Sequence, residues 1–326
     1  MNILITGATG FVGSFLAEKL LEKGHRVRTL VRTTSNLHWI ADLNVECFYG
    51  SLSDKDSLSH AIKDMDYIYH LAGVTKARNT DDYYRVNYEG TKNLIDVIRA
   101  GKVSLNRLLV TSSQAAVGPS PGLYAIDEKS EPHPLTDYGR SKLKAEQYAL
   151  AHKKEIPITV VRPPAVYGPR DTDVLQLFKT FKKGLIPKLG GTDRYLSLIH
   201  VYDLVDGMIL AAERKKSLGR TYFLANPQPY SIDRLAELTL QYFGKRGFRI
   251  NIPVFAMEGI ASLSEGISKL TGKPSILNSQ KVLEMKPEFW ICSPQRAMLD
   301  FNFKTRISLE EGIVLTLKWY EEQGWL

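Results

Sequence analysis

Short apolar runs alternate along the first half of the chain with segments in which apolar residues recur every three or four positions. Such runs, rich in β-branched residues, are typical of buried strands, and the intervening pattern is typical of helices that pack on them. Strands are expected at 2–6, 25–31, 45–49, 66–71, 105–112 and 158–162. Helices are expected at 14–23, from a cap at Ser53 or Asp54 to about Lys63, at 83–100 and at 136–153. This alternation predicts an α/β fold with a doubly wound parallel sheet, the Rossmann type.

The alternation weakens after Pro163-Pro164. Helical patterns follow at 171–183, 199–212, 231–244, 254–270 and 308–323, and a strand at 220–224 is expected to return to the sheet. We therefore expect a dinucleotide-binding domain over residues 1–170, joined by 199–225, and a smaller, mostly helical substrate lobe formed by 171–198 and 226–326. The pattern at 254–270 favours an amphipathic helix packed on this lobe, and an apolar wall over the substrate is the alternative.

Three glycines, Gly7, Gly10 and Gly13, separate the first strand from the first helix. In this context the first glycine allows a tight turn, the second lets a pyrophosphate approach the backbone, and the third lets the helix pack close to the strand. The free N–H groups and the dipole of the helix then favour a phosphate. The pattern therefore predicts a dinucleotide site, with an ordinary tight turn as the plain alternative.

Arg32 stands where the second strand ends. An acidic residue there would accept hydrogen bonds from an adenosine ribose, whereas an arginine can pair with a 2′-phosphate. Arg32 therefore favours NADP over NAD as the cofactor, unless it is only a surface residue.

The composition of the chain limits the kinds of molecule that it is expected to bind. The chain of 326 residues has 43 basic and 35 acidic side chains, a net charge of +8, and the charges are scattered, which suits an anionic cofactor better than a nucleic acid. Cys47 and Cys292 form neither a metal-ligand spacing nor a disulfide framework, and no stretch approaches about 18 uninterrupted apolar residues. We expect a soluble, cytoplasmic protein that binds a small molecule, with no metal, no membrane span and no nucleic-acid partner.

The chemical signal lies in Tyr138, Lys142 and Ser113. Residues four apart share one face of a helix, so we expect the Lys142 ammonium to lie beneath the Tyr138 phenol and to lower its pKa. Tyr138 would then serve as a general acid or base, and Ser113, at a strand end, would donate a hydrogen bond to a substrate oxygen. Beside a nicotinamide, these groups predict oxidation of an alcohol or reduction of a carbonyl.

Together these motifs resemble those of the extended short-chain dehydrogenases/reductases, in the broad epimerase/dehydratase superfamily. The matching segments are Thr6-Gly7-Ala8-Thr9-Gly10-Phe11-Val12-Gly13, His70-Leu71-Ala72-Gly73, Asn87-Tyr88-Glu89-Gly90-Thr91, Ser112 to Gly118, Tyr138 to Lys142, Arg162 to Pro169, and His200-Val201-Tyr202-Asp203. In the serine segment, the spacing to Gly118 selects Ser113 over Ser112.

The resemblance implies roles for these positions. Lys142 would also bond the nicotinamide ribose, residues 163–166 would flank the nicotinamide, and Asn87 would orient backbone or water. The cofactor-binding residues expected on this basis are Gly7, Thr9, Gly10, Phe11, Val12, Gly13, Arg32, Ser51, Leu52, Leu71, Ala72, Gly73, Asn87, Tyr138, Lys142, Pro163, Ala165 and Val166. A homodimer paired through the helices that hold Asn87 and Tyr138 is expected by analogy alone.

Several positions depart from the sugar-nucleotide members of the superfamily. Gln114-Ala115 replaces the Asp-Glu pair of the 4,6-dehydratases, whose elimination step needs an acid and a base there. Ala165 and Leu196 replace an asparagine and an arginine that contact substrate phosphates, with Arg194 or Lys188 as possible substitutes. Ser51 replaces the usual aspartate after the third strand.

These departures favour an oxidoreductase that interconverts a secondary alcohol and a ketone on a moderately apolar substrate. The lobe resembles that of dihydroflavonol-reductase-like and 3β-hydroxysteroid-dehydrogenase-like members. One alternative is an NAD-dependent sugar-nucleotide epimerase, whose substrate would be sugar-like. The other is a non-catalytic sensor that binds a dinucleotide.

Overall fold

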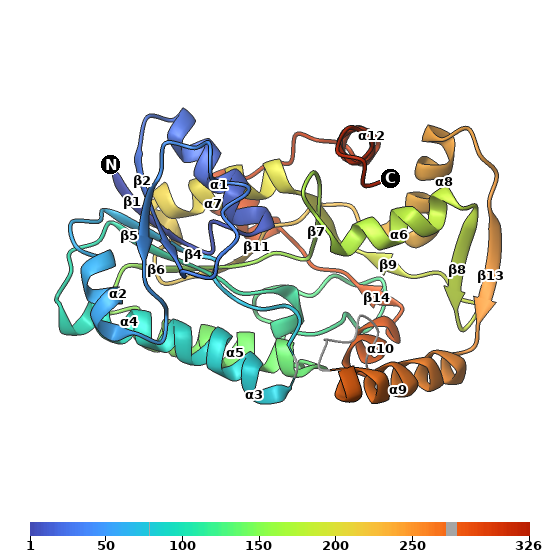
Figure 1. Cartoon of the computed structure of the whole chain (residues 1–326), viewed down its shortest axis with the longest axis horizontal. Helices are drawn as coiled ribbons and strands as arrows, with labels where there is room; N and C mark the ends of the chain where they lie inside the picture. The colour runs from blue at the N-terminus through green and yellow to red at the C-terminus, as the bar shows by residue number, and fades with distance from the viewer. Residues whose placement is uncertain (78, 272–278) are drawn as a thin grey trace.

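A seven-stranded parallel sheet forms the centre of the larger part of the molecule (Figure 1). The computed structural model describes residues 1–77, 79–271 and 279–326, with backbone alone for 266–271. The strands follow the order β11-β6-β5-β4-β1-β2-β3. Their bounds are Thr221–Phe223, Ile158–Arg162, Arg107–Thr111, Tyr67–His70, Asn2–Thr6, Arg26–Val31 and Glu46–Tyr49, in that order. The predicted parallel sheet is confirmed, and the strand expected at 220–224 does return to its edge beside β6.

Helices cover both faces of this sheet. One layer holds α1 (Phe11–Glu22) and α7 (Val201–Glu213), and the other holds α2 (Lys55–Ala61), α4 (Gly90–Ala100) and α5 (Asp137–Ala151) (Figure 1). Side chains of a strand alternate between the faces, so Ile3 and Ile5 of β1 join the cluster under the first layer while Leu4 joins the second. Both faces are therefore buried, as the apolar runs predicted.

The helix expected at 83–100 begins earlier and is not regular. It starts as α3 (Thr80–Tyr83), passes through a π-helical segment (Tyr84–Glu89) and continues as α4. Asn79 caps its start by accepting a hydrogen bond from the Asp82 N–H. The π-helical segment contains Asn87, and such segments are frequent at functional sites.

The smaller lobe combines helices with short strands. Its helices are α6 (Asp173–Lys182), α8 (Ile232–Tyr242), α9 (Val254–Thr271), α10 (Ser279–Met285) and α12 (Leu309–Glu322). Its strands are β8 (Leu185–Leu189), β9 (Tyr195–Leu196), β12 (Tyr230–Ser231), β13 (Phe248–Ile252) and β14 (Phe289–Trp290), arranged in the sheets β12-β9-β14 and β13-β8. A further pair, β7 (Ala165–Tyr167) and β10 (Leu198–His200), forms a separate two-stranded parallel sheet. These short strands were not predicted.

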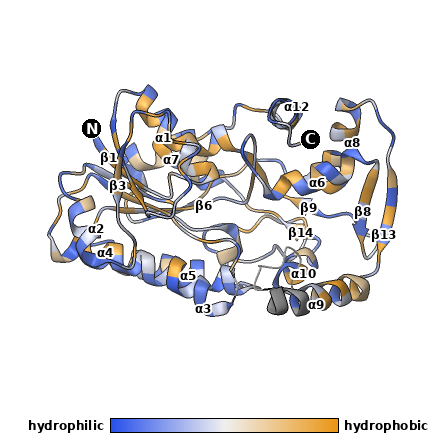
Figure 2. Cartoon of the chain, in the orientation of Figure 1, coloured by the Kyte–Doolittle hydropathy of each residue, from blue (hydrophilic) through white to orange (hydrophobic). Residues whose placement is uncertain are grey.

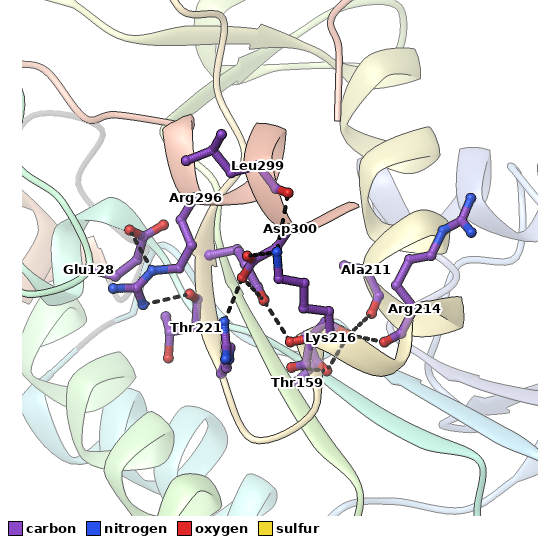
Figure 3. Close-up of polar contacts among 12 residues, drawn as sticks. Glu128, Thr159, Ala211, Arg214, Lys216, Thr221, Arg296, Leu299 and Asp300 are labelled. Carbon is purple, nitrogen blue, oxygen red and sulfur yellow. Dashed lines mark hydrogen bonds and ion pairs between the residues drawn. The ribbon is translucent and has the colours of Figure 1, made fainter. Parts of the chain in front are cut away.

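The helix α11 (Gln295–Phe301) lies against the edge strand β11 (Figure 3). The Asp300 carboxylate accepts from Lys216 and Arg220 at 2.9 Å each, and Arg296 reaches the Glu128 carboxylate and the Thr221 carbonyl. An open sheet edge can pair with other chains, and this cover prevents that.

No helix in the described part of the chain is long and apolar enough to cross a membrane.

Candidate active site

The glycines that follow β1 meet different surroundings. Gly7 has a φ of +85°, and a Cβ there would lie 2.7 Å from the Ala72 nitrogen. A Cβ on Gly13 would lie 2.2 Å from the Gly7 carbonyl oxygen, so only glycine lets α1 pack this closely on the turn. A Cβ on Gly10 would meet one neighbour within 4 Å, the Gly7 oxygen at 3.4 Å. Gly10 therefore faces open space, as a position approached by a ligand would.

The start of α1 is left without a side-chain cap. Several other helices, among them α2, α5, α8 and α12, are capped by a side chain, here Asp54, Thr136, Ser231 and Ser308. Gly10 at the N-cap of α1 offers no such acceptor, so the N–H groups of the first turn, from Phe11 onwards, remain available to an anion. An uncapped helix start beside an open glycine fits the pyrophosphate of a dinucleotide. Thr9 lies between these glycines in the same turn.

Arg32 directly follows β2 and is exposed. Its backbone N–H donates to the Ser35 hydroxyl at 3.0 Å, and its guanidinium forms no ion pair with any other described residue. Ser51 and Leu52 lie beyond the end of the neighbouring strand β3, where the Leu52 carbonyl accepts a hydrogen bond from Asn93 at 2.9 Å. These residues share the carboxyl edge of the sheet with the glycine turn.

Residues 70–73 form the opposite wall of that turn. His70 is buried between the hydroxyls of Thr6 and Thr91, at 2.7 and 2.9 Å, and burial lowers its pKa to about 3. Its two hydrogen bonds give it a structural role. The Ala72 N–H donates to the Thr6 hydroxyl at 3.3 Å, which holds Leu71, Ala72 and Gly73 at the end of β4.

Asn87 connects this wall to the helix α5. Its Oδ1 accepts from the Val74 N–H at 2.8 Å, and its Nδ2 donates to the Val74 carbonyl at 3.1 Å and to the Ser141 hydroxyl at 2.9 Å. Ser141 in turn donates to the Tyr138 carbonyl at 2.7 Å. Asn87 is fully buried and orients backbone, as expected, and Ser141 is a positioning residue that the motif alone did not indicate.

Tyr138 and Ser113 come together from α5 and from the end of β5. The Ser113 hydroxyl is a hydrogen-bond partner of Tyr138 and also accepts from the Ala115 N–H at 3.1 Å. Ser112 is instead buried, and its hydroxyl has no partner among the described residues. The ring of Tyr83 packs 6.2 Å from that of Tyr138, a neighbour that no sequence signal indicated.

The expected effect of Lys142 on Tyr138 is wrong in this structure. Burial raises the pKa of Tyr138 to about 12, and the hydrogen bond with Ser113 opposes that rise only in part. The Lys142 ammonium donates to the Thr111 carbonyl at 2.5 Å. Burial therefore outweighs any favourable charge, and the phenol stays protonated at neutral pH.

The pKa of Lys142 is also shifted. Burial lowers its pKa to about 8, and the Glu146 carboxylate, one turn further along α5, partly offsets this. Its Nζ also lies 3.7 Å from where a Cβ on Gly73 would be, close to the wall formed by residues 70–73. Lys142 can therefore place a positive charge between that wall and Tyr138.

Pro163, Ala165 and Val166 lie beyond the end of β6. The Pro163 carbonyl accepts from the Gln114 N–H at 2.9 Å, which ties this segment to the serine loop. Ala165 and Val166 belong to β7, which pairs with β10, and Ala165 is exposed. All three therefore lie beside the turn that carries Ser113.

Arg194 and Lys188 are both bonded within the lobe. Arg194 donates to the carbonyls of Met285 and Leu189 at 2.8 and 2.5 Å. Lys188 pairs with Asp233 at 2.8 Å and with Asp193 at 3.4 Å. Both cations therefore hold the lobe together, and Leu196 in β9 stays the apolar counterpart of the expected arginine.

Two further contacts near the site were not predicted from the sequence. The Asp203 carboxylate, in the first turn of α7, accepts hydrogen bonds from the backbone N–H groups of Arg306 and Ile307, and the His200 ring caps this helix. The helix α10, which was not predicted, approaches the start of α5, where Gln280 accepts from the Asp137 N–H at 2.9 Å. The helix α10 therefore contacts the backbone of α5 at the residue before Tyr138.

Comparison with known proteins agrees with this geometry. A sequence model of the NAD dependent epimerase/dehydratase family matches residues 3–225. The chain is 30% identical over 326 residues to a ceramide reductase of Caulobacter vibrioides, covering 99% of this chain and 96% of that protein. It is 27% identical over 341 residues to a 3 beta-hydroxysteroid dehydrogenase/Delta 5-->4-isomerase of Mycobacterium tuberculosis, covering 98% and 90%.

A solved structure, that of gox2253, superimposes with a TM-score of 0.82 at 28% identity, covering 99% of this chain and 98% of that one. The similarity thus extends over the lobe as well as the sheet.

Proposed function

The chain belongs to the NAD-dependent epimerase/dehydratase family, and on this premise we propose that it interconverts a secondary alcohol and a ketone on a largely apolar substrate. It is an NAD(P)-dependent dehydrogenase/reductase of the extended short-chain type. The observation that carries the proposal is the meeting of Tyr138 with Ser113 at the carboxyl edge of the sheet, with Lys142 close by.

The protonation state of Tyr138 assigns it a role. With a pKa near 12, the phenol carries its proton at neutral pH and can donate it to a carbonyl oxygen as the carbonyl is reduced. Ser113 donates a second hydrogen bond to the same oxygen as negative charge develops there. When bound, the nicotinamide dinucleotide supplies or accepts the hydride.

The chain's own residues would hold that dinucleotide as follows. The pyrophosphate would bind at Gly10 and the free N–H groups of α1, and Lys142 would reach the nicotinamide ribose beside Gly73. Arg32, exposed and without an ionic partner, would pair with a 2′-phosphate, so we propose NADP as the preferred cofactor. Residues 163–166 would lie against the nicotinamide.

The departures from the sugar-nucleotide pattern support an apolar substrate. Leu196 and Ala165 offer no charge to a diphosphate, and Arg194 and Lys188 are already bonded within the lobe. Ceramides and steroids, named for the two relatives, share a large hydrocarbon body. An epimerase remains compatible with the family, and the pairing of Ser113 with Tyr138 argues against a sensor without catalysis.

The organisation of the chain completes the proposal. We infer that residues 1–170 and 199–225 bind the cofactor and that 171–198 and 226–326 bind the substrate. We further propose a cytoplasmic homodimer that pairs through the helix that holds Asn87, formed by α3, the π-helical segment and α4, and through α5, which holds Tyr138. Both cysteines are free, which suits a reducing compartment.

The variant Tyr138→Phe tests the chemistry. It should keep cofactor affinity and lose about 10²- to 10⁴-fold in turnover of long-chain ketones, followed as consumption of reduced nicotinamide. Tyr148→Phe, ten positions further along α5, is the matched control and should turn over as the natural protein does. Full activity of Tyr138→Phe would refute the mechanism. Isomerisation of a nucleotide sugar without net oxidation would instead establish the epimerase.

A further inference from the structure

The helix α9 presents apolar side chains to solvent. Phe255 and Leu263 are 76% and 69% exposed, and Ile260 is about half exposed. At about 100° per residue these three span an arc of about 140°, whereas Met257 and Ala261 lie on the opposite, buried side. Figure 2 shows the hydrophobic colouring along this helix. A surface helix ordinarily turns its polar face outwards, so this arrangement is inverted.

The two carboxylates of α9 in the part with described side chains, 254–265, turn away from that arc. Glu258 pairs with Lys286 at 2.6 Å, and Glu265 accepts hydrogen bonds from the Ser279 N–H and hydroxyl. Both partners lie on or directly after α10. Within residues 254–265 the outer arc of α9 therefore carries no charge, because the two acids serve the contact with α10.

The ribbon of β8 and β13, which directly precedes α9, also carries exposed apolar side chains. Phe248 is 75% exposed, its register partner Leu185 is partly exposed, and so is Ile250, two residues along the same face. On the other face of the ribbon Ile186 is buried, and its register partner Arg249, itself exposed, pairs with Asp233 of α8. The ribbon runs directly into α9 through Pro253 (Figure 2). We call the exposed residues Leu185, Phe248, Ile250, Phe255, Ile260 and Leu263 the apolar rim.

Cations adjoin one end of the apolar rim. Lys183 precedes Leu185 by two residues, and Lys245 and Arg246 precede Phe248. None of the three forms an ion pair with another described residue, and Lys245 donates only to the Lys182 carbonyl. Together with Lys179 they form a basic cluster. An apolar surface bordered by free cations is complementary to the interface of an anionic bilayer.

We propose that the apolar rim and the basic cluster dock this protein on an anionic lipid membrane, which it touches without crossing. The apolar side chains enter the boundary between headgroups and acyl chains, and the cations contact the headgroups. The helix α10, packed on α9, reaches the start of α5 beside Tyr138, so the docked surface lies next to the active site. Delivery of a lipid substrate from the membrane to the active site rests on the proposed function. The contact with the membrane does not depend on that function.

Sedimentation with vesicles tests the proposal on the full chain. The natural protein should bind vesicles of phosphatidylcholine with phosphatidylglycerol, and bind phosphatidylcholine alone more weakly. The double variant Phe255→Ser/Leu263→Ser should lower both affinities by about tenfold or more. Lys245→Gln/Arg246→Gln should lower affinity about tenfold for the anionic vesicles only. Leu299→Ser is the matched control, 71% exposed on α11, and should bind normally.

Three outcomes would overturn the proposal. They are no binding of the natural protein to either vesicle, equal binding by the Phe255→Ser/Leu263→Ser variant, and loss of an oligomer in that variant, which would show that a second copy covers the rim. Circular dichroism and thermal unfolding confirm that each variant is folded. Vesicle binding by Tyr138→Phe separates the two proposals, because it requires no turnover.

Discussion

Arg162 of β6 and Glu146 of α5 form a buried, two-pronged ion pair. The Arg162 Nε donates to one carboxylate oxygen at 3.0 Å and the guanidinium Nη2 donates to the other. Both side chains are less than a tenth exposed, and the Phe223 ring lies against the guanidinium. This pair fixes α5 to the sheet one turn beyond Lys142, so it connects the stability of the fold to the placement of the helix that carries Tyr138 and Lys142.

Removing one partner should therefore be costly. Glu146→Gln leaves the Arg162 charge buried without a counterion, and we expect a loss of about 3–5 kcal/mol in the free energy of unfolding. The exposed pair of Arg234 and Glu310, at 2.8 Å, is the matched comparison, and Glu310→Gln should cost no more than about 1 kcal/mol. Urea denaturation of the two variants measures both quantities. Equal, small losses would mean that the buried pair does not hold α5 in place.

The low pKa of Lys142 predicts a pH dependence of activity. An ammonium loses its proton as the pH rises, so any step that needs this charge should slow through about pH 8, where burial places the pKa. Lys142→Arg keeps its charge at every accessible pH and should move this basic limb of kcat/KM upwards, even if the rate is lower. An unchanged limb in Lys142→Arg would assign it to another group.

The lowered pKa of Lys142 affects stability in the opposite direction from activity. Between about pH 8 and 10.5 the unfolded chain keeps the Lys142 proton that the folded chain has lost. The free energy of unfolding contributed by this residue therefore rises with pH over that window, while activity falls. Measuring both against pH separates a local titration from general unfolding.

The parts of the fold that were predicted depend on local patterns. Buried parallel strands are continuous apolar runs, which is why β1, β5 and β6 were found close to their observed bounds. Strands such as β9 and β14 have two residues each and exist only because distant segments pair. No local pattern can indicate a strand of that length, so the architecture of the lobe was predicted only as mostly helical.

The candidate site, too, was predicted correctly only where it depends on local spacing along the chain. Spacing along the chain indicated that Tyr138 and Lys142 share a helix face, and this is observed. The direction of the Tyr138 pKa shift was wrong because burial depends on residues distant in sequence, among them Tyr83, which packs against the ring. The bond from Asn87 to Ser141 joins residues 54 apart and was equally invisible to spacing.

The cofactor preference can be tested at Arg32. Arg32→Gln removes the charge proposed to pair with a 2′-phosphate, and a charge-assisted hydrogen bond contributes about 1.5–3 kcal/mol. NADPH affinity should therefore fall about tenfold or more while NADH affinity stays unchanged. Arg26→Gln, exposed at the other end of β2, controls for net charge. Binding titrations that show equal losses for both cofactors would remove the basis for preferring NADP.

The glycine turn offers a contrast between two substitutions of the same size. Gly13→Ala would place a Cβ 2.2 Å from the Gly7 oxygen, and the overpacking should cost about 1–3 kcal/mol of stability. Gly10→Ala meets no such clash, and its φ of −89° suits alanine, so the protein should fold normally.

The added methyl group at Gly10 nevertheless fills the open space that we assign to the pyrophosphate. Dinucleotide affinity should therefore fall by about tenfold or more without a change in thermal unfolding. Thermal unfolding without cofactor and equilibrium cofactor binding together check both substitutions. Normal cofactor binding by Gly10→Ala would show that the pyrophosphate does not approach the backbone there, and the site would have to be sought elsewhere along the sheet edge.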